Sequence, residues 1–344
     1  MDPLTHIVAG RAVVAAADRH QPALRGVAWA ATLGALSPDI DSAVAFSGWD
    51  RYVRVHEIGT HSIFGALAMA CLTAAVVKGV ARLRDAVGDA RRVARRRNPA
   101  PFGVLLAAAT AGAFSHLALD VASGARIRIA WPIVPRVVTL PLVAMADPWL
   151  IAICVVGLLA LRRGGQPLRT VSRAMIAAAL VFLAIKGVLL ARALRVSGFG
   201  DAPFSAVEAQ WGTLTEWQMF ERTPALVRAW AVRSGGAPPA VVMSQALGPD
   251  TPLVGASRRL ESVRNFLATH EFTFPIERTA DAGGTEVLWS DLRYCWSDEA
   301  GPKGPALQEI ECGVWAGGLF GPDGTAIRQL VRIGAVTQTR PAPR

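Results

Sequence analysis

Residues 98–120 read NPAPFGVLLAAATAGAFSHLALD, and the rest of the chain is understood most easily from this segment. Its first 22 residues carry no charge, and a helix needs about 20 such residues to cross the hydrocarbon layer of a membrane. The segment closes with His116 and Asp120, side chains that are costly beside lipid and that serve as metal ligands. We therefore expect a membrane-spanning helix with polar chemistry at one end.

The composition of the whole chain agrees with a membrane protein. Of its 344 residues, 52% are hydrophobic and 18% are charged, and the mean hydropathy is +0.35, whereas an ordinary soluble domain is roughly one-quarter charged. Residues 26–38 are too short to span a membrane and are expected to form a helical hairpin with residues 4–17. The apolar runs predicted to span are residues 58–77, 98–119, 137–161 and 174–191.

The net charge of +10 is unevenly distributed. Residues 1–199 carry 23 Lys and Arg against 10 Asp and Glu, whereas residues 200–344 carry 13 against 16. The arginines gather in the short loops 78–97 and 162–173, so the positive-inside rule explains the excess and places both loops in the cytoplasm. Nucleic acid is therefore not an expected partner, and the C-terminal half is expected outside the cytoplasm.

This orientation brings polar residues to one side of the membrane. His56 and His61 open an inward helix, while His116 and Asp120 close an outward one, so both pairs fall on the outer face. His116 and Asp120 are four residues apart on one helical face and can reach one divalent ion, such as zinc. A hydrogen bond between a helix-end histidine and an aspartate explains the same spacing without a metal.

Residues 56–61, HEIGTH, superficially resemble the zincin metalloprotease motif. The two histidines are five residues apart rather than four, so they would not share the helical face that this motif requires, and we reject a metalloprotease. We expect His61 to bind metal and His56 to bind metal or shuttle protons. The alternative is that each is a hydrogen-bonded histidine at the membrane interface.

Asp39, Asp41 and His6 are weak candidates for metal ligands on their own and become stronger candidates beside these histidines. Asp39 and Asp41 follow an apolar run, where two aspartates separated by one residue can face a cation, although a helix-stop turn also tolerates them. His6 lies inside an apolar stretch four residues after Asp2. Convergence on one membrane face with acidic partners makes a shared metal site the better explanation.

Six short motifs follow one another in order: residues 1–6 (MDPLTH) with Gly10, 36–41 (LSPDID), 56–61 with Ser62, 116–120 (HLALD), 131–132 (WP) and 147–148 (DP). As an ordered set they resemble the bacterial membrane-bound metal-dependent hydrolases of the YdjM type over roughly residues 1–160. The resemblance implies a bacterial inner-membrane hydrolase, and residues 288–294 resemble the tail of longer members. One departure is Glu57, where the family usually has a basic residue. Glu57 can act as an acid, a base or a ligand, or be merely tolerated.

A weaker resemblance reaches the zinc-dependent phospholipase C and P1-type nuclease group. The ligands of that group run His, Asp, His and then His-x3-Asp. The same order is followed here by His6, Asp39 or Asp41, His61, and His116 with Asp120. A later His-x3-Glu pair of that group is absent from this chain. This resemblance implies one or two metal ions, with Asp120 able to bridge them, and a phosphoester substrate.

The C-terminal half has a different pattern. Residues 257–270 are predicted to form one amphipathic helix, and Cys295 with Cys312 can form a disulfide if the domain is exported. The predicted fold is a multi-pass α-helical membrane domain, residues 1–197, followed by a small α+β extramembrane domain, residues 198–344. Short apolar runs predict strands at residues 225–232, 240–246, 285–292, 314–320 and 327–333.

The leading hypothesis is a membrane-embedded hydrolase that depends on a divalent metal, zinc or a similar ion. It would act on a phosphoester of a membrane lipid or lipid-linked compound, with Glu57, Asp41 or His56 as the base. The rival is a non-catalytic membrane sensor or regulator with a structural metal, and no inverted repeat supports a transporter. The expected metal ligands are His6, Asp39, Asp41, His56, His61, His116 and Asp120.

Overall fold

The computed structural model describes residues 1–17, 24–56, 58–87, 100–163, 167–198, 206–280, 283–296 and 311–342. The chain forms two compact units. The helical unit comprises Met1–Asp41, His56–Leu190 and Glu208–Leu214. The β-rich unit comprises Ser42–Val55, Ala191–Val207 and Thr215–Arg344.

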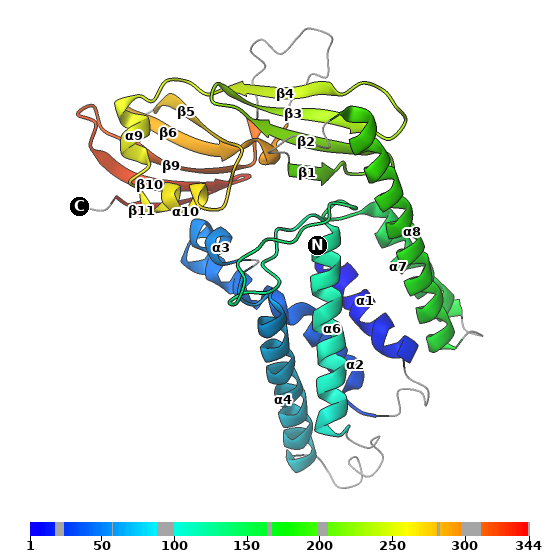
Figure 1. The fold of residues 1–344 in the computed structure, drawn as a ribbon. Helices are drawn as coiled ribbons and strands as arrows, with labels where there is room; N and C mark the ends of the chain where they lie inside the picture. Colours follow the sequence, from blue (N-terminus) through cyan, green and yellow to red (C-terminus); the bar gives the residue numbers. More distant parts are fainter. Residues whose placement is uncertain are drawn as a thin grey trace. The chain divides into compact units, whose positions relative to one another are not determined.

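The helical unit confirms the predicted multi-pass α-helical membrane fold. Its helices are α1 (Pro3–Ala17), α2 (Val27–Leu36), α4 (Ile63–Val87), α6 (Phe102–Ala122), α7 (Pro148–Arg163) and α8 (Leu168–Ser197), and a 3-10 segment, η1 (Ser37–Ser47), continues α2. Helices α4, α6 and α8 are long and apolar enough to cross a membrane. The predicted hairpin of short helices is present as α1 and α2, which pack against each other and against α6 (Figure 1).

The spanning helix predicted over residues 137–161 is wrong. Helix α7 begins only at Pro148, and the apolar residues before it form a loop in which Ile127 and Val138 pair as an isolated bridge. Asp147 sets the helix start because its carboxylate accepts hydrogen bonds from two backbone N–H groups of the first turn. Proline is also favoured at the first helical position. Hydrophobicity alone does not distinguish such an apolar loop from a helix.

Small residues allow α2 and α6 to pack almost backbone to backbone. A Cβ atom added at Gly112 would lie 2.4 Å from the carbonyl oxygen of Ala31, and one added at Gly34 would lie 2.3 Å from the carbonyl oxygen of Ala109. Both distances are below any normal contact, so only glycine fits at these two positions. This close approach carries the ends of α2 and α6, and the polar residues on them, to the same place.

The lysine within α8 has a structural explanation. Lys186 is fully buried, and its ammonium donates hydrogen bonds to the carbonyl oxygens of Thr213 and Leu214 at 3.3 and 3.2 Å. A charge within a membrane helix is costly unless it is paired in this way. Trp211 contributes a further bond, from its indole Nε1 to the carbonyl of Ala146 at 2.8 Å. Lys186 therefore fastens the segment Glu208–Leu214 to the helical unit.

The β-rich unit is built from antiparallel strands with two short helices. One sheet has the order β1-β2-β3-β4, a second has the order β11-β10-β9-β6-β5, and β7 pairs with β8. The elements are α3 (Trp49–Val55), β1 (Ala206–Ala209), β2 (Glu216–Arg222), β3 (Leu226–Arg233), β4 (Ala240–Ala246), α9 (Pro252–Ser257), α10 (Glu261–Leu267), β5 (Thr273–Ala280), β6 (Gly284–Asp291), β7 (Cys295–Trp296), β8 (Glu311–Cys312), β9 (Val314–Phe320), β10 (Ala326–Ile333) and β11 (Val336–Pro341).

All five predicted strands are present within one residue of their predicted bounds, as β3, β4, β6, β9 and β10. The single helix predicted over residues 257–270 is wrong, because the chain forms α9 and α10 with Leu260 extended between them (φ −66°, ψ 139°). The predicted apolar face is nevertheless buried, and Leu260, Val263 and Phe266 pack with strand residues of the five-stranded sheet.

The two cysteines of the β-rich unit form a disulfide. Cys295 and Cys312 are bonded across the β7–β8 pair, 17 residues apart in sequence. The pairing that the sequence left open is thus present. Cys71 and Cys154, which lie in α4 and α7, are free.

Candidate metal centre

Helix α6 positions the first two side chains of the cluster. His116 and Asp120 lie one turn apart near the end of the helix, and both are buried. His116 Nε2 is 2.9 Å from Asp120 Oδ2. The i, i+4 spacing read from the sequence therefore places the two side chains on one face, as expected.

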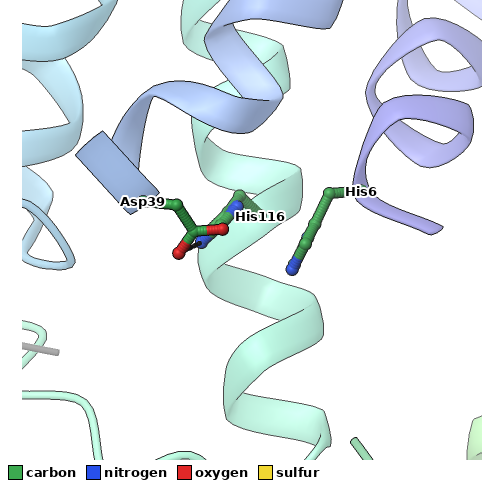
Figure 2. Close-up of side chains that lie close together, drawn as sticks. All are labelled: His6, Asp39 and His116. Carbon is green, nitrogen blue, oxygen red and sulfur yellow. Dashed lines mark ion pairs between the residues drawn. The ribbon is translucent and has the colours of Figure 1, made fainter. Parts of the chain in front are cut away.

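Two more side chains reach this pair from other elements. His61, which lies two residues before the start of α4, is fully buried, and its Nε2 is 3.2 Å from His116 Nε2. Asp39 comes from η1, and its Oδ1 lies 3.3 Å from His61 Nε2 and 3.5 Å from His116 Nε2. Figure 2 shows the Asp39 carboxylate and the His116 ring pointing toward each other. Three separate segments therefore converge on one point.

The donor atoms of His61, His116 and Asp120 are close enough to share one ion, since all three lie within 4.8 Å of one another. Zinc binds histidine nitrogen and carboxylate oxygen at about 2.0–2.2 Å, which places neighbouring ligand atoms about 3.3–3.6 Å apart. The distances among these three residues are 3.2, 2.9 and 3.6 Å. Asp39 lies within 3.5 Å of both histidines and is a candidate for a further ligand.

The outer ring nitrogens of both histidines have acceptors of their own. His116 Nδ1 lies 2.7 Å from the carbonyl oxygen of Ala35, which can only accept, so Nδ1 carries the proton. His61 Nδ1 faces Asp41 Oδ2 at 3.5 Å. A metal-binding histidine commonly donates its second ring N–H to a carbonyl or carboxylate in this way, which leaves the Nε2 lone pair for the ion.

His6 from α1 lies on the side of His116 opposite to Asp39 (Figure 2). The two imidazole rings are stacked with centroids 3.8 Å apart (Figure 2), and His6 Nε2 is 3.1 Å from Asp120 Oδ1. The angles do not make this contact a hydrogen bond, and neither nitrogen of the buried His6 ring has a hydrogen-bond partner among the described residues. The amino group of Met1 also reaches Asp120 Oδ1, at 2.6 Å. Buried polar atoms without partners are unusual and point to an additional ligand.

Asp41 joins His56 to the cluster. Its Oδ1 lies 2.9 Å from His56 Nδ1, and its Oδ2 accepts a hydrogen bond from the Thr60 hydroxyl at 2.8 Å. Burial acts to raise the pKa of Asp41, but hydrogen bonds with His56 and His61 outweigh it and hold that pKa well below its usual value. Burial acts to lower the pKa of His61, but hydrogen bonds with Asp39 and Asp41 raise it to about 9. The surroundings of His61 therefore favour a cation.

The structure brings together nearly every residue that the sequence singled out. Three groups are close enough to share an ion, with donor atoms within 4.8 Å: His6, Asp39 and His116; Asp39, His56 and His61; His61, His116 and Asp120. Glu57 lies outside the described residues. The sequence did not reveal the Ala35 carbonyl or the Thr60 hydroxyl, although Thr60 stands next to His61 and could have drawn attention for that reason.

The fold and this cluster define a class: a membrane protein with several apolar helices and a buried cluster of histidine and aspartate able to hold a divalent metal. The family model described as YdjM inner membrane protein matches residues 1–193. The chain belongs to this family, and the resemblance seen in the motifs is confirmed. No curated protein and no solved structure matches the chain.

Proposed function

We propose that this protein is a membrane-embedded hydrolase that depends on a divalent metal, zinc or a similar ion. One observation carries the proposal: histidine and carboxylate donor atoms from three segments lie 2.9–3.6 Å from one another across a buried site. Among the described residues, hydrogen bonding leaves both nitrogens of the buried His6 ring without a partner, which also favours an additional ligand.

Four residues would hold the ion, namely His61, His116, Asp39 and Asp120. An ion held there would polarise a phosphoryl oxygen and acidify a water molecule. Asp39 is the most accessible of the four, since its side chain is 30% exposed whereas that of Asp120 is 5% exposed and both histidines are fully buried. Substrate would therefore approach from the Asp39 side. His6 would support Asp120, or bind a second ion together with Asp39 and His116.

His56 is the proposed base. Its side chain is 21% exposed, and its Nδ1 lies 2.9 Å from Asp41 Oδ1, so Nε2 would be the nitrogen that takes a proton from water. Asp41 itself is nearly buried and contacts His56, His61 and Thr60. Asp41 would therefore orient the two histidines, and this role suits it better than that of the base.

The proposed substrate is a phosphoester of a membrane lipid or lipid-linked compound at the outer face of the bacterial inner membrane. Three features support this side. The cytoplasmic assignment of the arginine-rich loops places the ends of α4 and α6 that carry the cluster outside. The disulfide between Cys295 and Cys312 suits an oxidising compartment. The loop before α7 exposes apolar side chains, among them Ile133 at 74% and Met145 at 72%, which suit a lipid interface.

One observation favours the rival function, a sensor or regulator with a structural metal. Four protein donors close a tetrahedral shell, and closed shells are typical of structural zinc, whereas catalytic zinc has three protein ligands and an open position. The partial exposure of Asp39 supports the enzyme, because a ligand at the surface can yield its position. The Asp39→Ala variant separates the two functions.

The test begins with metal analysis of the full-length protein purified in detergent. We expect about one or two equivalents of a divalent ion in the wild type. The His116→Ala variant should bind it more than about a hundredfold more weakly, since loss of an orienting partner alone costs 10–100-fold. His270→Gln, which changes a histidine of the β-rich unit, is the matched control and should keep the metal. A wild-type protein without metal affinity contradicts the proposal.

Activity is then measured on phosphoester lipids in mixed micelles. His56→Ala should keep the metal and lose about 10²–10⁴-fold in rate, the usual contribution of a general base. Asp39→Ala should keep part of the metal affinity and change the rate. If Asp39→Ala abolishes binding and no phosphoester is cleaved by the wild type, the sensor function is the better description.

A further inference from the structure

The segment between two residues of the candidate site belongs to the β-rich unit. Asp41 and His56 lie in the helical unit and contact each other at 2.9 Å. The intervening residues, Ser42–Val55, group instead with the β-rich unit and contain helix α3. The family match ends at residue 193. The residues that hold α3 therefore lie in a part of the chain that the family model does not cover.

Asp50 is the centre of the contacts that hold α3. It is fully buried, and its Oδ1 forms an ion pair with Arg340 of β11 at 2.6 Å. Its Oδ2 accepts a hydrogen bond from Asn265 of α10 at 2.8 Å. A buried carboxylate left without such partners is strongly destabilising, so Asp50 keeps its place only while Arg340 and Asn265 surround it.

Three further contacts surround this buried pair. Arg51 forms two hydrogen bonds with the Glu261 carboxylate, at 3.1 and 3.3 Å, and Arg54 donates to Asn265 at 2.8 Å. The backbone N–H of Trp49 donates to the Gln338 side chain of β11 at 3.0 Å. Polar contacts therefore extend along α3, and all of them go to α10 or β11.

We propose that the β-rich unit positions the candidate metal centre by holding Ser42–Val55, with Asp50 as the positioning residue. The residues that flank this segment, Asp41 and His56, are both site residues, and Asp41 contacts His61 as well as His56. Release of α3 would free the chain that directly follows Asp41 and the chain that directly precedes His56. The folded state of the β-rich unit would thereby affect the metal affinity of the site. The inference rests on the proposed metal site.

The experiment changes only residues outside Ser42–Val55, so that any effect on the metal must be transmitted through it. Co²⁺ affinity and the visible spectrum of the Co²⁺-loaded protein are measured for full-length wild type and for the double variant Asn265→Ala/Arg340→Gln. Limited trypsin cleavage after Arg51 and Arg54 reports release of α3. The matched control is Arg278→Gln, which removes an ion pair with Glu286 at 2.7 Å elsewhere in the same unit.

We expect faster cleavage at Arg51 or Arg54, about tenfold or more weaker Co²⁺ binding and an altered spectrum in the double variant, the scale seen when an orienting partner is lost. Arg278→Gln should match the wild type. Thermal unfolding and disulfide content check that the β-rich unit still folds. Restoring Arg340 alone should recover part of the affinity.

Faster cleavage with unchanged Co²⁺ affinity and spectrum overturns the inference, and so does a double variant that changes neither. A wild-type protein that does not bind Co²⁺ contradicts the proposed function itself. The two failures are therefore distinguishable.

Discussion

Asp291 of the β-rich unit and the buried histidines of the helical unit have opposite surroundings. In the β-rich unit, Asp291 is fully buried and satisfied locally: Arg293 contacts both carboxylate oxygens at 2.9 Å, and backbone N–H groups of Arg293 and Phe272 add two more bonds. In the helical unit, His61 and His116 direct Nε2 atoms toward each other at 3.2 Å between two carboxylates.

This difference teaches where to look for function. A buried polar group that serves the fold finds enough donors or acceptors close by. A polar group that binds a ligand lacks part of its hydrogen bonds until the ligand is bound. The rest of the fold must be stable enough to offset the free energy that this costs. In the helical unit, the close packing of α2 against α6 provides this stability.

The largest effect is expected from Gly112→Val in the helical unit. The new Cβ would lie 2.4 Å from the Ala31 carbonyl oxygen and 2.7 Å from the Ala35 backbone nitrogen, so α2 and α6 could not approach. We expect little folded protein in size-exclusion chromatography and no metal binding. Gly103→Val, on the same helix with no atom within 4 Å of its Cβ, should fold normally. Normal folding of Gly112→Val would contradict this packing.

Asp291→Asn should destabilise the β-rich unit by about 3–5 kcal/mol, because one partner of a buried ion pair is removed. Thermal or urea unfolding, followed by tryptophan fluorescence, measures this loss. Metal affinity of the helical unit should fall only if α3 is released. An exposed carboxylate of the same unit, changed by Asp323→Asn, provides the control. A loss below about 1 kcal/mol would show that Asp291 is not structural in the way described.

Loss of the disulfide should cost the β-rich unit about 3 kcal/mol, the value for a loop of some 15 residues, since Cys295 and Cys312 are 17 apart. Unfolding of the Cys295→Ser/Cys312→Ser variant measures it. Cys71→Ser/Cys154→Ser, which removes the two free thiols, is the control and should change little. Equal stability of both variants would contradict the structural role of the disulfide.

Metal should stabilise the helical unit by about 2.7 kcal/mol when present at a hundredfold excess over its Kd. In Asp120→Asn this gain should disappear, because one of the proposed ligands is gone. Thermal unfolding with and without Zn²⁺ in detergent measures the gain in both proteins. An equal gain in Asp120→Asn and in the wild type would contradict the contrast between the two units.

The smallest effect is a pH dependence confined to the β-rich unit. Burial acts to raise the pKa of Asp291, but Arg293 outweighs it and holds the pKa below the ordinary value of about 3.9. The stabilisation is therefore complete above about pH 4 and is lost as the pH falls through the folded-state pKa. Unfolding measured between pH 3 and pH 7 should show this decline in the wild type and a smaller one in Asp291→Asn.

The sequence predicted the elements with a clear period or length. Runs of apolar residues revealed α4, α6 and α8, and alternation revealed β9 and β10 within one residue. It failed at residues 137–161, where an apolar loop precedes α7, and at residues 257–270, where an extended Leu260 divides two helices. Strands such as β2, β5 and β11 escaped because their mixed polar composition carries no strong periodicity.

The chain by itself determined which residue types were available and on which helix ends they stand, because hydrophobic length, charge bias and the i, i+4 spacing are local properties. Only the tertiary structure decided that Asp39 and His61 meet His116 within 3.5 Å, that Asp41 contacts both His56 and His61, and that α3 belongs to the β-rich unit. Such contacts depend on how closely α2 and α6 pack and on where the loops return. Those long-range distances leave no period in the sequence.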